Sequence, residues 1–175
     1  LLVQSGRLAG QSTLIAAWSF NEGTGTTSDD RSTNDHTATL SGPAWTTGKY
    51  GGGLSFDGVD DVVSVADAND LDFSSAFTIE AWVRPDVSAA VRPLVRKGAS
   101  SGFAYSLLLT TDTKPKAEVV IGGTTYSVTG SSVLADTTWT HVAATFTGSQ
   151  LRVYVNGVLD GRSEEHTSEL QSPVV

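Results

Sequence analysis

The chain has 175 residues, a formal net charge of −8, 18 glycines and no cysteine. The acidic balance excludes a nucleic-acid partner, because phosphate binding needs clustered Lys and Arg, and the lack of cysteine excludes disulfides and thiolate metal sites. This length fits one domain with a full core, and we expect no membrane span because no run of about 18 or more apolar residues occurs.

The first part of the chain alternates short apolar runs with loops rich in Gly, Ser and Asp, which is typical of an all-β protein. We expect residues 1–12 to be a linker or the tail of a preceding segment. The predicted strands that follow are residues 14–20, 38–40, 54–56 and 62–65. The last two flank a tight reversal, which predicts that they pair as a hairpin.

Residues 77–83 are predicted to form the central strand of a β-sandwich. Their side chains alternate, so that Phe77, Ile79, Ala81 and Val83 share one face while Thr78, Glu80 and Trp82 share the other. Because a tryptophan stands on the second face, we expect this strand to be covered on both faces. Pro85 then ends the strand, since proline has no N–H to donate.

The second part of the chain contains two dipeptides that are typical of two-residue hairpin turns. Gly122-Gly123 predicts pairing of residues 117–121 with 124–128, and Asn156-Gly157 predicts a strand returning along residues 151–155. Further strands are predicted at residues 94–97, 105–109 and 139–146. The return strand begins at Val158, but the residues after Leu159 do not continue its pattern. We therefore expect residues 151–155 to lack part of their partner and to leave an open sheet edge, unless the residues after 161 are forced into a surrogate strand.

Five motifs in this order resemble the laminin-G-like, concanavalin A-like lectin/glucanase superfamily, in the bacterial form found in large secreted or surface proteins. They are AWSFNE (17–22), FDGVDD (56–61), FTIEAWV (77–83), WTHVA (139–143) and VYVNG (153–157). The resemblance covers residues 14–161 and implies a jelly roll of two antiparallel sheets. It also implies ligand or calcium sites on one rim or on the concave face. On this basis we expect an incomplete laminin-G-like domain at residues 13–161.

Residues 162–172 (RSEEHTSELQS) depart from that family and resemble a translated sequencing adapter. Domains of the family normally close with two or three further strands, and no such pattern follows residue 161. The hypothesis is that residues 162–175 are a non-native tail and that the domain is C-terminally truncated. The alternative is an acidic, solvated tail.

The predicted central strand carries a single carboxylate, that of Glu80. Retaining glucanases of this superfamily need two carboxylates about 5–5.5 Å apart. We therefore expect no catalysis, and we expect Glu80 to bond Arg84, a neighbouring strand or a loop. His141 lies in an apolar strand and is interpreted as a hydrogen-bonded core or rim histidine.

Two loops are candidate calcium sites, because Ca²⁺ prefers six to eight oxygen ligands on irregular backbone. Asp30, Ser32 and Asn34 match a pattern that the resemblance associates with this position, although Thr33 replaces its glycine. The other candidate is the group Asp57, Asp60 and Asp61. Its alternative explanation is turn chemistry, in which aspartate side chains bond backbone N–H groups around Gly58.

Sugar binding requires exposed aromatic faces beside polar groups. Trp45, in a loop rich in Gly and Pro, and Tyr126, beside the Gly-Gly turn, are the candidate ligand-binding residues. Trp18, Trp82 and Trp139 lie in apolar strands and are expected in the core.

The function expected from these observations is a non-catalytic, extracellular or cell-surface recognition module that binds carbohydrate and belongs to a larger polypeptide with other domains. The alternative is a calcium-stiffened structural or adhesion module that binds protein partners. A glycoside hydrolase domain is a third hypothesis, and it would require a second carboxylate within reach of Glu80.

Overall fold

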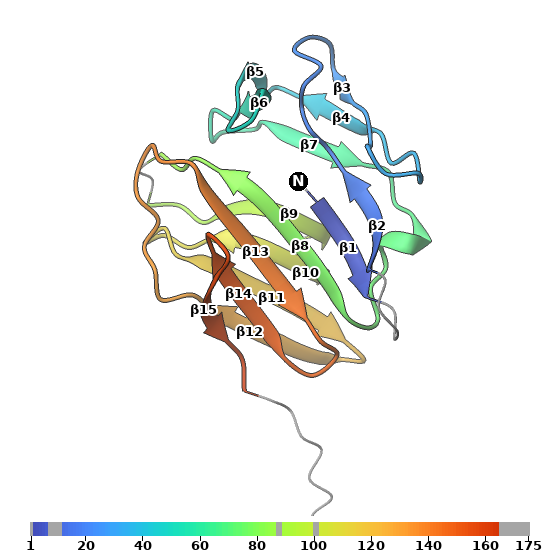
Figure 1. Cartoon of the computed structure of the whole chain (residues 1–175), viewed down its shortest axis with the longest axis vertical. Coiled ribbons are helices and arrows are strands. Elements are labelled where there is room, and N and C mark those ends of the chain that lie inside the picture. The colour runs from blue at the N-terminus through green and yellow to red at the C-terminus, as the bar shows by residue number, and fades with distance from the viewer. Residues whose placement is uncertain (1, 7–11, 87–88, 100–101, 165–175) are drawn as a thin grey trace, which may run out of the picture.

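The computed structural model describes residues 2–6, 12–86, 89–99 and 102–164, and within these ranges every sheet is antiparallel. The one helical turn that it assigns there is the 3₁₀ segment η1 (Asn69–Leu71). Two large sheets lie face to face, and smaller strand groups lie at one end of them (Figure 1). This arrangement confirms the predicted all-β class. No helix in the described ranges is long and apolar enough to cross a membrane.

The front sheet in Figure 1 has six strands in the order β15-β14-β13-β8-β1-β2. The predicted central strand, β8, lies between β13 and β1, and both pairings are antiparallel. The bounds are β1 (Leu2–Gly6), β2 (Ser12–Ala17), β8 (Phe77–Val83), β13 (Thr140–Phe146), β14 (Leu151–Val155) and β15 (Val158–Arg162).

The sheet behind it has four strands in the order β12-β11-β10-β9. These are β9 (Arg92–Ala99), β10 (Gly102–Leu109), β11 (Pro115–Ile121) and β12 (Thr124–Thr129). Two smaller sheets complete the fold: β3 (Thr27–Ser28), β4 (Ala38–Ser41) and β7 (Val62–Val65) form one, and β5 (Ala44–Thr47) and β6 (Gly52–Ser55) form the other.

The core fills the space between the two large sheets with the inward residues of each strand. Phe77 and Ile79 of β8 are 2% and 1% exposed, as their alternation predicts. They meet Tyr105 and Leu107 of β10 in one cluster, and the Phe77 and Tyr105 ring centroids are 5.6 Å apart. A fully buried side chain of this size contributes about 1.5–3 kcal/mol, so this cluster is a main source of stability.

Both predicted two-residue turns are confirmed. Gly122 and Gly123 have φ angles of 58° and 79°, and the hairpin of β11 and β12 closes around them. Asn156 and Gly157 have φ angles of 49° and 79°, and they connect β14 to β15. Positive φ at both central positions is the geometry of a type I′ turn, which these residue types adopt at little cost.

Two expectations about the first part of the chain are wrong. Residues 2–6 are not linker but strand β1, which pairs with both β8 and β2. The strands around residues 57–61 do not pair with one another, because β6 pairs with β5 and β7 pairs with β4. The β5–β6 pairing depends on Gly48, where an added Cβ would lie 2.0 Å from the Gly52 carbonyl oxygen.

The expectation of an incomplete partner for residues 151–155 is also wrong. Strand β15 continues to Arg162 and pairs along β14 from Val155 to Arg152, with one bulge. The ladder is extended by Ser163, whose N–H donates to the Leu151 carbonyl at 2.8 Å. Residues 165–175 lie outside the described ranges, so the hypothesis of a non-native tail stays a prediction there.

Candidate functional site

The outer face of the six-stranded sheet carries a tryptophan that the sequence analysis placed in the core. Trp82 of β8 is 38% exposed, so the expected cover over the second face of β8 is absent at this residue. The reason is that the four-stranded sheet packs on the inner face alone, where Phe77 and Ile79 lie. Alternation along the strand therefore directs Trp82 to the surface.

A second aromatic ring comes from the turn between β5 and β6. Tyr50 is 70% exposed, and its ring meets that of Trp82 edge to face, with centroids 5.4 Å apart and planes at 90°. Asn21 holds this turn in place, because its Oδ1 accepts a hydrogen bond from the Gly52 N–H at 2.6 Å. Gly51 has a φ of 83°, and a Cβ there would lie 2.4 Å from the same Asn21 oxygen. The local backbone thus holds Tyr50 over the sheet.

Polar groups lie beside these rings on the neighbouring strand. His141 of β13 is registered opposite Trp82, and their ring centroids are 5.3 Å apart. Its Nε2 lies 3.6 Å from Oε2 of Glu80, so Glu80 contacts a neighbouring strand, one of the roles expected for it. Asn156 positions this strand, because its Oδ1 accepts the His141 N–H at 3.0 Å.

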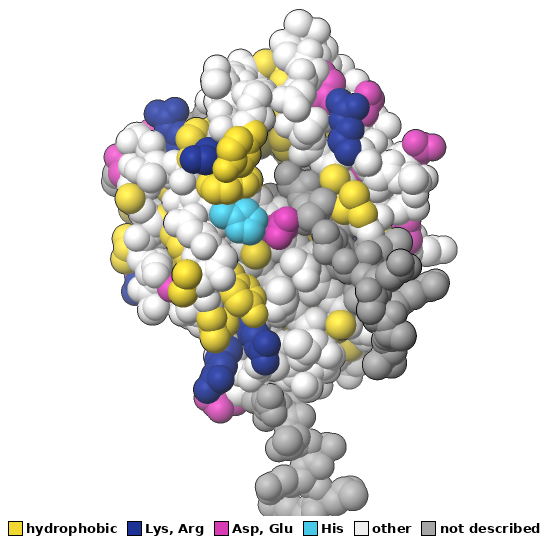
Figure 2. All heavy atoms as spheres, viewed as in Figure 1, with side chains coloured by type: hydrophobic (Ala, Val, Ile, Leu, Met, Phe, Trp, Pro, Cys, Tyr) yellow, Lys and Arg dark blue, Asp and Glu magenta, His cyan; other side chains and the backbone are white. Residues whose placement is uncertain are grey.

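Lys49 completes the group. Its Nζ lies 5.1 Å from the centroid of the Trp82 ring and 5.7 Å from that of Tyr50, which are cation–π distances. We call Lys49, Tyr50, Glu80, Trp82 and His141 the Trp82 cluster. Figure 2 shows this face, where hydrophobic side chains gather beside a basic, a histidine and an acidic side chain. Exposed rings with hydrogen-bonding groups at their edges are suited to the apolar faces and hydroxyls of sugars.

The two aromatic residues predicted to bind ligand lie outside the Trp82 cluster. Trp45 is half-buried, and its Nε1–H donates to the Gly25 carbonyl at 2.8 Å. Tyr126 packs against the core, with its ring 4.9 Å from that of Phe146. The sequence analysis missed Tyr50 and misplaced Trp82. The alternation of residues 77–83 did place Trp82 opposite to the buried set, and this was the signal that could have found it.

In the first candidate calcium loop, Asp30, Ser32 and Asn34 lie close together as predicted. Their polar groups already form hydrogen bonds within the protein. Asp30 Oδ1 accepts the N–H groups of Ala17 and Ser32, each at 2.8 Å. Its Oδ2 lies 2.6 Å from the Ser32 hydroxyl and 3.1 Å from the His36 N–H, while Asn34 Nδ2 donates to the Ile15 carbonyl. Burial works to raise the pKa of Asp30, but these hydrogen bonds outweigh it and hold the pKa below its usual value. This geometry favours a structural role, in which Asp30 joins the loop to β2.

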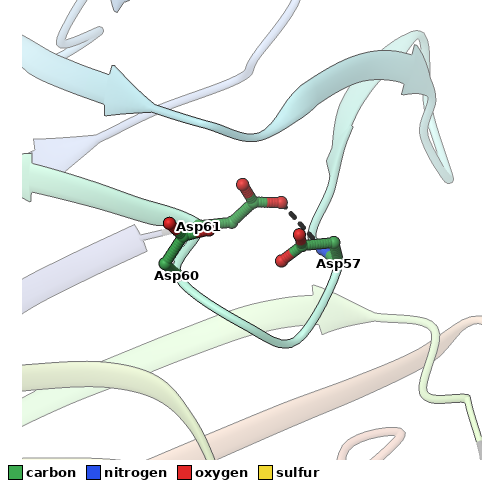
Figure 3. Close-up of side chains that lie close together, drawn as sticks. All are labelled: Asp57, Asp60 and Asp61. Atoms are coloured by element: carbon green, nitrogen blue, oxygen red, sulfur yellow. Dashed lines mark hydrogen bonds between the residues drawn. The ribbon is translucent and has the colours of Figure 1, made fainter.

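The second candidate, shown in Figure 3, is a better fit for a cation. Asp57, Asp60 and Asp61 each offer a carboxylate oxygen, and the three oxygens lie within 4.8 Å of one another. Two of the carboxylates also support the turn: Asp61 Oδ2 accepts the Asp57 N–H at 2.7 Å, and Asp57 Oδ1 accepts the Val59 N–H at 2.8 Å. None of the three forms a salt bridge with a cationic side chain in the described ranges. Bound Ca²⁺ would reduce the repulsion between these three negative charges, and water molecules would complete its shell of oxygen ligands.

Comparison with known proteins agrees with this architecture. A family model described as the concanavalin A-like lectin/glucanases superfamily matches residues 57–173. A 2.1 Å crystal structure of an S-layer domain-containing protein (residues 221–444) from Clostridium thermocellum ATCC 27405 is 28% identical to the chain and has a TM-score of 0.56. The match covers 89% of this chain and 75% of that one, whereas no curated protein matches. Together with the two antiparallel sheets, these matches show that the chain belongs to the concanavalin A-like lectin/glucanase superfamily.

Proposed function

We propose that this domain is a non-catalytic carbohydrate-binding module of an extracellular or cell-surface protein and that it binds glycan on the Trp82 cluster. The observation that carries the proposal is the exposed pair of rings, Trp82 and Tyr50, on the face of β8 that points away from the four-stranded sheet. Such rings offer large, rigid apolar area at a low cost in conformational entropy, and a sugar ring can stack on them. Glu80 and His141 at the edge of the rings provide hydrogen-bonding partners for sugar hydroxyls.

The surroundings of Glu80 support a binding role rather than hydrolysis. The residues opposite it on the paired strands are Ala143 on β13 and Leu2 on β1. The residues two positions away on its own strand are Thr78 and Trp82. None of these four carries a carboxyl group, while retaining glycosidases need a second carboxylate about 5–5.5 Å from the first.

The similarity to an S-layer domain-containing protein supports a location at the cell surface. The alternative function, a calcium-stiffened adhesion module, is supported by one different observation: the cluster of Asp57, Asp60 and Asp61. A cation there would stiffen the loop between β6 and β7 without taking part in glycan binding. If the domain is such an adhesion module rather than a glycan binder, its ligand is a protein partner and it is not retained on polysaccharides.

The test is a pull-down on insoluble polysaccharides, followed by isothermal titration calorimetry with soluble oligosaccharides of those retained. Trp82→Ala should weaken binding at least about tenfold, which corresponds to ~1.4 kcal/mol or more for a central aromatic contact. Phe56→Ala is the matched control, because Phe56 is 52% exposed but lies outside the Trp82 cluster. Unchanged binding by Trp82→Ala would reject the site, and no retention on any polysaccharide would favour the adhesion module.

A further inference from the structure

We propose that the glycan bound by the Trp82 cluster is an acidic polysaccharide that contains uronic acids. The carboxylate of a uronic acid ring would form an ion pair with the ammonium group of Lys49. This inference rests on the carbohydrate-binding function proposed above and names its ligand class. It depends on how the positive charges of the chain are distributed, on what Lys49 contacts, and on where a carboxylate lies on a sugar ring.

The first step is that Lys49 differs from every other lysine in the chain. The sequence contains four lysines, and all four lie in the described ranges. Lys97, Lys114 and Lys116 each form a salt bridge with an aspartate or glutamate at 2.7–2.9 Å. Lys49 forms none with a described carboxylate, and its ammonium lies over the two exposed rings instead. In an acidic chain, this leaves one lysine able to receive an outside anion.

The second step is that the present contacts of Lys49 are weak enough to be exchanged. A cation–π contact at an exposed site is worth about 0.5–1 kcal/mol. A hydrogen bond between an ammonium and a carboxylate is shorter and roughly twice as strong as a neutral hydrogen bond. The four-carbon stem of lysine is flexible, so the ammonium can turn from the faces of Trp82 and Tyr50 to a ligand that stacks on them.

The third step is the balance of charge around Trp82. Glu80 is the acidic member of the cluster, and its carboxylate lies 3.6 Å from the imidazole of His141. Arg84 follows Trp82 by two positions, and its Nε–H donates to the Thr137 carbonyl at 3.1 Å. It also forms no salt bridge with a described carboxylate. Lys49 and Arg84 are thus two cations on this side of β8 without a salt bridge among the described residues, in a chain whose net charge is −8.

The fourth step is the chemistry of the ligand. In a uronic acid the carboxylate is bonded to C5 of the sugar ring itself, so it projects from the ring edge. When the apolar face of such a ring stacks on Trp82 or Tyr50, the carboxylate lies beside the aromatic surface rather than over it. Lys49 is next to Tyr50 in the sequence, and its ammonium lies 5.1 and 5.7 Å from the centroids of the two rings. When its flexible stem turns the ammonium away from the ring faces, it can reach a carboxylate beside them.

The test is isothermal titration calorimetry of the full chain with polygalacturonate and with its methyl ester, two polymers that differ only in the free carboxylate. Wild-type protein should bind the acid form more tightly, and added salt should reduce the difference because exposed charges are screened. Lys49→Gln should lower affinity for the acid form by up to about fivefold, the limit for one exposed ionic contact, and leave the ester unchanged. Lys116→Gln is the matched control, because Lys116 lies on β11 of the other sheet and pairs with Glu118.

The outcomes separate this inference from the proposed function. Equal affinity for the acid and the ester, or a preference that Lys49→Gln leaves intact, would overturn the inference while glycan binding stands. Tighter binding of dextran sulfate than of polygalacturonate, with no binding of dextran, would replace the uronate by a sulfate ester. Loss of all polysaccharide binding in the wild type, or unchanged binding by Trp82→Ala, would overturn both.

Discussion

Trp82 on β8 and His141 on β13 lie directly opposite one another, with their ring centroids 5.3 Å apart and their planes inclined by 54°. The Tyr50 ring also meets this indole edge to face, so two rings contact it. Cross-strand pairs of this kind stabilise a sheet by about 0.2–1 kcal/mol each, and this pair also fixes the orientation of an exposed ring. The affinity of this face thus depends on how Tyr50 and His141 orient Trp82.

Replacing His141 with Ala should weaken glycan binding several-fold, because Trp82 loses one of the two rings that orient it. The thermal midpoint should fall by only a few degrees, since His141 lies at the surface side of the sheet. Calorimetric titration together with differential scanning fluorimetry measures both effects. His141→Phe keeps a ring at this position and should recover the part of the affinity that comes from the orientation of Trp82, but not a hydrogen bond to the sugar, whereas equal losses in both variants would contradict an orienting role.

Replacing Gly51 with Ala should lower both stability and glycan affinity. The new Cβ would collide with Asn21 Oδ1, and the turn that carries Tyr50 would have to shift. Gly58→Ala is a matched control, because Gly58 has a similar φ of 79° but open space around its Cβ position. Both variants should lose about 1 kcal/mol or more from backbone strain, but affinity should fall in Gly51→Ala alone. A parallel loss of affinity in the Gly58 variant would show that the effect is general.

Calcium should raise the thermal midpoint of the wild-type protein relative to the same protein in chelator. A site filled at about 100 times its Kd stabilises the folded state by about 2.7 kcal/mol. The double substitution Asp57→Asn, Asp60→Asn should abolish this shift, because it removes two of the three clustered charges. An identical midpoint with and without calcium in the wild type would exclude the site, and the Asp30 loop should not contribute to the shift.

The free energy of unfolding should decrease at acidic pH, in part because the Asp30 carboxylate becomes protonated. Its folded pKa is below the ordinary value of 3.8, because four hydrogen bonds to the charged form outweigh the opposing effect of burial. A lowered folded pKa means that the carboxylate contributes stability above about pH 3.8 and loses it as the pH falls through the folded value. Urea unfolding across this range measures the loss.

Asp30→Asn tests the assignment directly. It should cost about 1–3 kcal/mol at neutral pH, since buried donors lose a charged acceptor. The difference between wild type and variant should shrink as the pH falls from about 3.8 through the lower folded pKa of Asp30, where the wild-type carboxylate also becomes protonated. Asp29→Asn is a suitable control, because the Asp29 contact with Glu22 is made by its backbone N–H and not by its carboxylate. A difference that stays constant with pH would contradict the role of the Asp30 charge.

Local patterns in the sequence predicted most of the strands, because alternation and turn chemistry act over a few residues. The buried face of β8 and the turn at Gly122-Gly123 both followed from such patterns. Pairing between distant segments was not predictable in this way. Residues 2–6 join β8 and β2 through backbone hydrogen bonds, and no local signal marked them as a strand inside the sheet.

The candidate site was predicted less well than the fold. Whether an outward tryptophan such as Trp82 is covered depends on the number of layers, and this is a property of the whole fold. Tyr50 reaches Trp82 because the β5–β6 turn bends over the sheet, which needs Asn21 to hold Gly52. In contrast, the clustering of Asp57, Asp60 and Asp61 was predictable, since five consecutive residues in a tight turn cannot lie far apart.

The position of β8 between β1 and β13 also has a consequence for biosynthesis. Its two hydrogen-bonding partners begin at Leu2 and at Thr140, so β1 leaves the ribosome well before β8 and β13 leaves it well after. Until β13 emerges, the nascent chain carries Phe77 and Ile79 on a strand with one free edge. Sheets closed by such distant segments fold slowly, and half-made chains are prone to aggregate. Slower growth at low temperature, or co-expressed chaperones, should therefore raise the soluble yield.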